Sequence, residues 1–168
     1  MTAILGLDVG ERRVGVAIAE AGGLAARPLT TLQRHRSIAA DASDLLALIE
    51  RHGVGELVVG LPYEAAGGEG AQAALTRAWV EAVIAAIGEA APPVAFQDER
   101  LSSHVAETRL GPMRRGRSGG PPTKSQRDAY RSRVDREAAA IILQDALDTR
   151  RDAQASMTRP QTSMETPA

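Results

Sequence analysis

The order of apolar and polar positions predicts three strands at the start of the chain. Apolar runs at residues 4–9 and 14–19 flank the polar turn Glu11-Arg12-Arg13, so we expect a β-hairpin there. Residues 27–32 predict a third strand, with Pro28 near its start, where a proline is tolerated. A dinucleotide-binding unit is not indicated, because its glycine turn has the spacing Gly-x-Gly-x-x-Gly and leads into a helix.

Helices and strands alternate along the rest of the chain. We expect a first helix between the cap residues Ser37 and Gly53. Further helices are expected at about residues 71–89, 102–110 and 129–148, and further strands at 56–60 and 94–97. This order predicts an α/β fold with a mixed five-stranded sheet and helices on both faces. We expect one domain over residues 1–149 and a disordered tail over residues 150–168.

Composition narrows the classes of protein. The chain has 168 residues, a hydrophobic fraction of 43% and no cysteine, which excludes a disulfide scaffold, a thiolate zinc site and a cysteine nucleophile. Aromatic residues make up 2%, so stacking on aromatic rings is not expected to drive nucleic-acid binding. No signal peptide is recognisable, and no apolar run approaches the ~20 residues of a membrane span, so we expect a cytoplasmic protein.

Three acidic residues stand out by their positions. Asp8 lies inside the apolar run of the first strand, where a charge is costly unless a cation pairs with it. Glu99 follows the last predicted strand, at the edge where open α/β sheets bind their ligands. Asp135 shares one face of the final helix with apolar residues that must pack on the sheet.

Carboxylates that converge from these positions predict a site for divalent cations. Oxygen ligands suit Mg²⁺ or Mn²⁺, and two such ions about 3.5–4 Å apart activate a water and stabilise the leaving oxygen of a phosphodiester. Each acid taken alone also has a simpler interpretation. Asp8 could pair with an arginine, Glu99 could bridge to Arg100, and Asp135 could be an acid near the start of a helix.

Basic residues concentrate around Asp135. Between Arg109 and Arg136 only Asp128 and Asp135 oppose a series of Arg and Lys residues, although the net charge of the whole chain is −1. Most charge runs are solvated surface, but this one includes a glycine-rich stretch that can follow a phosphate backbone. The residues that we expect to contact nucleic acid are Arg12, Arg13, Arg100, Arg114, Arg115, Arg117, Lys124, Arg127 and Arg131.

Four blocks of the sequence resemble the YqgF (RuvX) family. The blocks are Leu5-Gly6-Leu7-Asp8-Val9-Gly10 with Arg12 to Ala17, Val58 to Pro62, Asp98 to Ser102, and Val134 to Gln144. They occur in order and span most of the predicted domain. One departure is Tyr63-Glu64-Ala65-Ala66-Gly67-Gly68, which stands where the family has an Asn-x-Asp-Gly-like stretch. The departure puts in doubt the substrate contacts of this loop and leaves the acids untouched.

The resemblance implies a ribonuclease H-like fold related to Holliday-junction resolvases. It also implies a metal-dependent nuclease that matures the 5′ end of pre-16S rRNA, with the family's acidic triad at Asp8, Glu99 and Asp135. As partners we expect structured RNA or branched DNA and ribosomal particles, and as oligomeric state a monomer or weak homodimer. Three alternatives stay open: a Holliday-junction-type DNA resolvase, a non-catalytic RNA-binding ribosome-assembly module, and an actin- or sugar-kinase-like nucleotide-binding domain.

Overall fold

The computed structural model describes residues 1–63, 70–99, 102–113 and 119–158. It has five strands and four α-helices within these residues, with one 3₁₀ turn, η1, at Gly88–Ala90. The strands are β1 (Ala3–Val9), β2 (Arg13–Ala19), β3 (Arg27–Gln33), β4 (Val54–Pro62) and β5 (Val94–Glu99). The helices are α1 (Ile38–His52), α2 (Ala71–Ile87), α3 (Ser102–Leu110) and α4 (Lys124–Thr158). The predicted order of elements is confirmed.

The five strands form one mixed sheet in the order β3-β2-β1-β4-β5. β1 pairs antiparallel with β2 and β2 with β3, as the predicted meander requires. β4 and β5 join in parallel after crossover helices, so β1, β4 and β5 all end at the same edge of the sheet. The expectation of a mixed five-stranded sheet is therefore correct, and its parallel part has one shared carboxyl-terminal edge.

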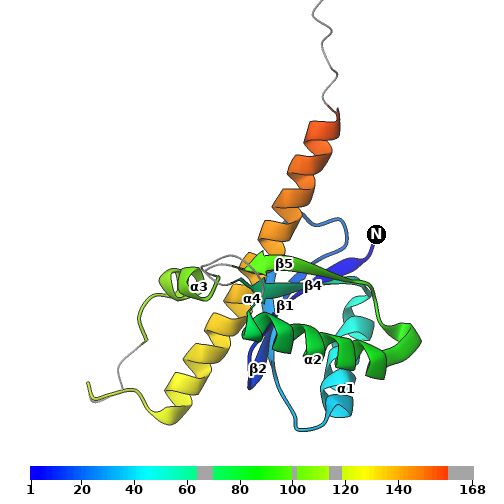
Figure 1. The fold of residues 1–168 in the computed structure, drawn as a ribbon. Coiled ribbons are helices and arrows are strands. Elements are labelled where there is room, and N and C mark those ends of the chain that lie inside the picture. Colours follow the sequence, from blue (N-terminus) through cyan, green and yellow to red (C-terminus); the bar gives the residue numbers. More distant parts are fainter. Residues whose placement is uncertain (64–69, 100–101, 114–118, 159–168) are drawn as a thin grey trace, which may run out of the picture.

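Helices cover both faces of the sheet, as predicted (Figure 1). On one face α1 and α2 pack on large aliphatic side chains of β1, β2 and β4, and this layer holds the main core. Helix α1 ends as expected at Gly53, whose left-handed φ of 60° is one that glycine adopts without strain. On the other face α4 crosses β1, β2 and β3, and α3 packs on α4.

Glycines allow α4 to approach the sheet closely. A Cβ atom at Gly6 would lie 2.6 Å from the Cβ of Leu143, and one at Gly15 would lie 2.0 Å from the carbonyl oxygen of Asp135. Neither strand could carry a side chain at these positions without moving the helix. The backbone of α4 is therefore held against β1 and β2, next to Asp8.

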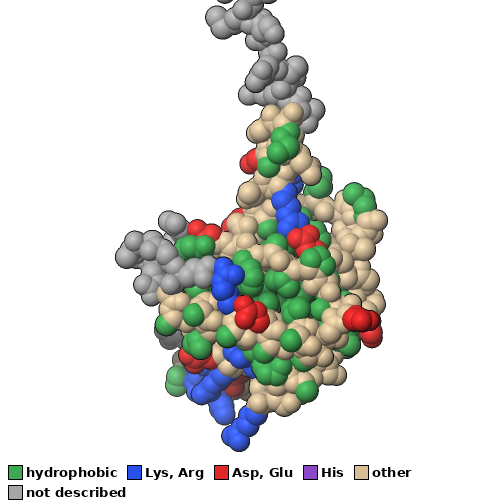
Figure 2. All heavy atoms as spheres, turned by 45° about the vertical axis from the view of Figure 1, so that its right-hand side comes forward, with side chains coloured by type: hydrophobic (Ala, Val, Ile, Leu, Met, Phe, Trp, Pro, Cys, Tyr) green, Lys and Arg blue, Asp and Glu red, His purple; other side chains and the backbone are tan. Residues whose placement is uncertain are grey.

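Two sequence expectations are wrong in detail. Helix α4 continues to Thr158, so a disordered tail does not begin at residue 150, and residues 159–168 lie outside the described part of the chain. Arg150 is one reason, because its guanidinium forms a two-point ion pair with Glu56 of β4 and ties the helix to the sheet. Beyond it the helix projects from the body (Figures 1 and 2).

The second error concerns the buried face of α2. In the sequence, Leu75 shares one helical face with Trp79 and Val83, and this spacing predicts that Leu75 is buried. In the structure Leu75 is 62% exposed, and Thr76 is 2% exposed in its place. A helix rich in alanine has no single apolar stripe, so the large residues Trp79, Val80 and Val83 decide its rotation. Every helix in the described residues is too short or too polar to span a lipid bilayer.

Candidate active site

Asp8 lies on β1 and faces α4. Its neighbours Leu7 and Val9 belong to the core under α1 and α2, and the alternation of side chains along a strand places Asp8 on the opposite face. It pairs with Gly15 of β2 in the antiparallel register, and the carbonyl of Asp135 lies directly over Gly15. The structure thus brings the first and third predicted acids to the same part of the sheet.

Glu99 reaches the same place from the end of β5. Its backbone pairs with Pro62, and its Oε2 lies 2.7 Å from the position that a Cβ of Gly60 would occupy. Gly60 follows Val59, the partner of Leu7 across β1 and β4, so it lies beside Asp8. A glycine at this position leaves room for the glutamate to lean toward the middle of the sheet.

Asp135 is held by an ion pair with Arg13. Its Oδ2 accepts a hydrogen bond from Arg13 Nε at 2.6 Å, and the two side chains are 24% and 19% exposed. Arg13 was predicted to contact nucleic acid, but the structure gives it a partner within the acidic site. Because this bond is charge-assisted and only partly open to water, it fixes the direction of the Asp135 carboxylate.

The electrostatics of the three acids are linked. Burial, followed by the charges of Glu99 and Asp135, raises the pKa of Asp8 from 3.8 to about 8. Burial also raises the pKa of Glu99 from 4.5 to about 7. Asp8 has no ion pair or hydrogen bond with a cationic side chain in the described ranges, so the alternative of an arginine-paired Asp8 is not supported.

The donor set fits a divalent cation. A buried carboxylate such as Asp8, whose pKa is raised by burial and by two neighbouring carboxylates, gains most from a positive ion, and the ligand atoms of all three acids are oxygens. In the residues that the structure describes, however, no group of three His, Asp or Glu side chains is already arranged to hold a metal ion. Coordination by all three acids therefore requires side chains to move. The ion pair with Arg13 already engages one oxygen of Asp135 and leaves the other for a cation.

The predicted nucleic-acid contacts have different outcomes. Arg12 is exposed in the turn beside the acids, and Lys124, Arg127 and Arg131 are exposed on the first turns of α4. Arg127 also donates a hydrogen bond to the carbonyl of Pro122. Four predicted residues lie outside the described part of the chain, namely Arg100, Arg114, Arg115 and Arg117. Residues 64–68, most of the stretch that departs from the family pattern, also lie outside it.

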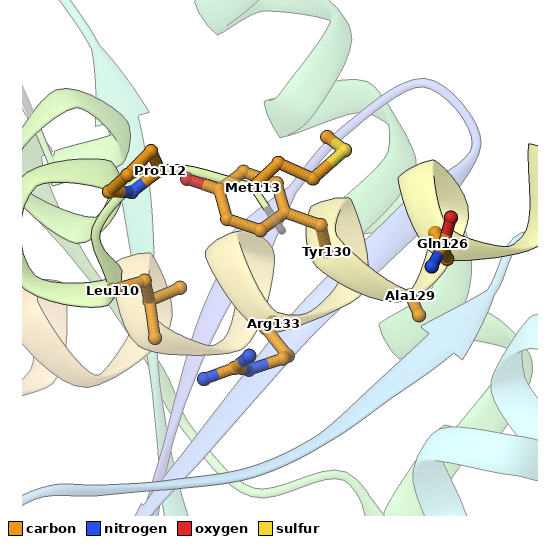
Figure 3. Close-up of a pocket in the computed structure, with 7 residues that line it drawn as sticks. All are labelled: Leu110, Pro112, Met113, Gln126, Ala129, Tyr130 and Arg133. Carbon is orange, nitrogen blue, oxygen red and sulfur yellow. The ribbon is translucent and has the colours of Figure 1, made fainter. Parts of the chain in front are cut away.

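A pocket of about 400 Å³ lies between the end of α3 and the start of α4. Leu110, Pro112 and Met113 line it from the end of α3 and the segment that follows, and Tyr130 and Arg133 line it from α4 (Figure 3). Tyr130 donates a hydrogen bond from its hydroxyl to the carbonyl of Gly111 at 2.9 Å, which fixes the chain after α3. The pocket borders the basic turns of α4.

Sequence reasoning missed the residues that bring the acids together. No local motif in the sequence distinguishes Gly6, Gly15 and Gly60 from other glycines in strands. Their role depends on the side chains and the helix that lie against them. The hairpin offered one signal, because counting back from the Glu11-Arg12-Arg13 turn pairs Gly15 with Asp8. The partnership of Arg13 with Asp135, 122 residues away, had no local signal.

Known proteins resemble this chain in sequence and in fold. Residues 2–149 match the family model RuvX, described as Holliday junction resolvase. A protein of Chloroflexus aggregans, named "Putative pre-16S rRNA nuclease", is 42% identical over 149 residues that cover 89% of this chain and 95% of the relative. A protein of the same name from Anaeromyxobacter is 43% identical over 146 residues, covering 87% and 96%.

A structural relative supports the description of the fold. RuvC of T. thermophilus, solved with a Holliday junction substrate, aligns with a TM-score of 0.50 at 17% identity and covers 90% of this chain and 97% of its own. The sheet order, the helices on both faces and this likeness confirm the predicted ribonuclease H-like fold. With a family model that matches nearly the whole described domain, the chain belongs to the RuvX family.

Proposed function

We propose that this protein is a metal-dependent nuclease that hydrolyses phosphodiester bonds in the 5′-end maturation of pre-16S rRNA. The observation that carries the proposal is the convergence of Asp8, Glu99 and Asp135 at one edge of the sheet, where the latter two raise the pKa of the first. The names of the relatives from Chloroflexus aggregans and Anaeromyxobacter support the choice of substrate.

The three acids are proposed as the ligands of Mg²⁺ or Mn²⁺. An ion bound there supplies Lewis-acid activation of a water and neutralises charge on the leaving oxygen. Asp8 releases its proton when the ion binds, because an ion and a proton compete for the same oxygens. Arg13 holds Asp135 in the direction of the sheet, and it neutralises one of the three charges when no ion is bound.

The exposed cations are proposed to hold the substrate. Arg12 lies beside the acids, and Lys124, Arg127 and Arg131 extend the positive surface along α4. Arg100, Arg114, Arg115 and Arg117 are proposed to add to it, on the strength of the sequence alone. Contacts of this kind bind the phosphate backbone without reading base sequence, so they suit a structured RNA within a ribosomal particle.

The main alternative is cleavage of four-way DNA junctions. The description of the family model as Holliday junction resolvase favours it. A site made of carboxylates and phosphate-binding cations acts on the common backbone of RNA and DNA, so the chemistry of the site is the same for both. The two substrates differ in shape, and shape is what an assay must vary.

The test is cleavage by the purified full-length protein. End-labelled precursor rRNA and a labelled four-way DNA junction are incubated with Mg²⁺, with Mn²⁺ or with a chelator, and Asp8→Asn serves as the control for contaminating nucleases. We expect cation-dependent cleavage of the precursor and none by the variant. Faster cleavage of the junction supports the DNA alternative. Binding of RNA without cleavage under any condition contradicts the proposal and supports a non-catalytic assembly factor.

A further inference from the structure

A second, smaller pocket lies on the face of the sheet opposite to the acids. It has a volume of about 180 Å³ and lies where the end of β1 meets the first two turns of α2. In Figure 1, α2 begins on the side of the molecule at which the arrow of β5 ends. The residues that line the pocket are Val9, Glu11, Arg34, Gln72, Leu75 and Thr76.

Two residues of this lining each have a buried polar atom without a hydrogen-bond partner among the described residues. The two atoms are the hydroxyl oxygen of Thr76, a residue only 2% exposed, and Nε of Arg34. Buried polar groups in folded proteins are almost always paired, and one that is not costs free energy. Arg34 Nε can only donate, and the Thr76 hydroxyl can donate as well. Both groups suit a ligand that offers several acceptor oxygens.

Helix α2 adds a positive end. Its N-cap is Gly70, which has no side chain to cap the first N–H groups, and no acidic residue occupies the first turn. The first helical hydrogen bond is donated by Ala74, so earlier N–H groups carry the positive end of the helix dipole. Such helix starts bind phosphate groups.

The charge of Arg34 is held in place at this pocket. Its Nη1 donates to the carbonyl of Gly10 at 2.8 Å, and its guanidinium lies 5.2 Å from the centre of the Trp79 ring. Trp79 is in turn fixed by a 2.8 Å hydrogen bond from Nε1 to the buried Asp41. The arginine is therefore preorganised, which reduces the entropy lost when a ligand binds.

We propose that this pocket binds a phosphate group of the nucleic-acid backbone. Val9 follows Asp8 on β1, so the pocket and the acids lie on opposite faces of one edge of the sheet. A strand that crosses this edge places one phosphate near the acids and another in the pocket. The inference rests on the proposed function in that it takes a nucleic acid as the substrate. Among the described residues of the lining Glu11 is the one carboxylate, and it weakens the binding of an anion.

The experiment measures binding without cleavage. Trp79 is the only tryptophan of the chain, and its ring contacts the guanidinium of Arg34. A ligand that binds Arg34 should therefore change the fluorescence of Trp79. Full-length protein in chelator is titrated with a single-stranded RNA oligonucleotide and, separately, with inorganic phosphate. Thr76→Val removes the hydroxyl and keeps the shape, while Thr149→Val makes the same change on an exposed turn of α4.

We expect Thr76→Val to weaken the binding of both ligands by about tenfold or more, since a hydrogen bond to a charged group is lost. Thr149→Val binds like the wild type, and Glu11→Gln binds a few-fold more tightly. Urea unfolding of Thr76→Val checks its fold, and loss of an unpaired hydroxyl leaves the midpoint equal or higher. This result would exclude unfolding as the cause of weaker binding.

Equal oligonucleotide affinity of Thr76→Val and wild type overturns the inference. A loss confined to inorganic phosphate also overturns it, because the pocket then takes a free anion and not the backbone. Neither outcome contradicts the proposed nuclease activity, because the cleavage assay tests that activity separately. Conversely, a protein that binds through Thr76 and never cleaves keeps this pocket and loses the proposed function.

Discussion

The two faces of the sheet are built on opposite principles. Under α1 and α2 the strands carry large aliphatic side chains such as Leu5, Leu7 and Ile18, and the helices stand off by the width of those side chains. Under α4, β1 and β2 carry the small residues Gly6, Gly15, Ala17 and Ala19, so the helix backbone lies almost on these two strands. The first face holds most of the large, fully buried side chains. The second face has fewer large side chains, and the close approach of α4 brings three carboxylates together.

The largest effect is expected from a substitution at Gly15, where α4 leaves no room for a side chain. In Gly15→Ala the new Cβ meets the carbonyl of Asp135, so α4 must move and the acids must separate. We expect the free energy of unfolding to fall by about 3 kcal/mol or more, and nuclease activity to be lost even in the molecules that remain folded. Urea unfolding and cleavage per folded molecule measure the two effects.

Leu5→Ala is the matched change on the first face. Leu5 is fully buried under α1 and α2, and its truncation should cost about 2–5 kcal/mol. Activity per folded molecule should stay near the wild type, since no helix next to the acids is displaced. Equal losses of activity in Leu5→Ala and Gly15→Ala would mean that the two faces are not specialised.

Asp8→Asn separates function from stability within the second face. The amide keeps the shape and removes a buried charge that Glu99 and Asp135 oppose. We expect cleavage to fall by more than about a hundredfold, the upper end of losses seen when only the support of a metal ligand is removed. In the absence of metal, the variant should unfold at the same or a higher urea concentration. A folded Asp8→Asn protein with wild-type turnover would exclude Asp8 as a ligand.

The pH dependence of stability should report the same acids. In metal-free protein the folded-state pKa values of Asp8 and Glu99, about 8 and about 7, lie above their ordinary values of 3.8 and 4.5. The unfolded chain therefore loses these protons first, and the stability that they contribute is full below pH 4 and is lost as pH rises through 7 to 8. Urea unfolding in chelator at pH 5 and pH 8 measures it, and Asp8→Asn should flatten the difference.

The sequence predicted the order of strands and helices along the chain, and it singled out three acids, because those signals are local. Apolar runs, the polar turn and Gly53 each act within a few residues, and an acid inside an apolar strand is visible by itself. The Arg13–Asp135 pair and the glycine contacts under α4 join residues more than a hundred positions apart, so no local pattern contains them. The predictions of the buried face of α2 and of the end of α4 were wrong for the same reason, because residues far away in the sequence decide both.

The smallest effect is expected from the exposed cations of α4. Replacing Lys124, Arg127 and Arg131 by Ala removes three proposed phosphate contacts and no metal ligand. Each lost contact should flatten the slope of log affinity against log salt by roughly 0.7–0.9, while single-turnover cleavage at saturating protein stays close to the wild type. Binding measured at several salt concentrations tests this, and an unchanged slope would assign these residues to plain solvated surface.

The most direct test of the central claim is a calorimetric titration of the metal-free protein with Mn²⁺ at pH 8. We predict saturable binding that releases protons, because Asp8 must give up its own, and clearly weaker binding by Asp8→Asn, Glu99→Gln and Asp135→Asn. The double variant of Asp8→Asn with Asp135→Asn should lose little more than the single variants, since ligands of one site act as a unit. Binding of equal strength and stoichiometry in the wild type and all three single variants would contradict a shared cation site.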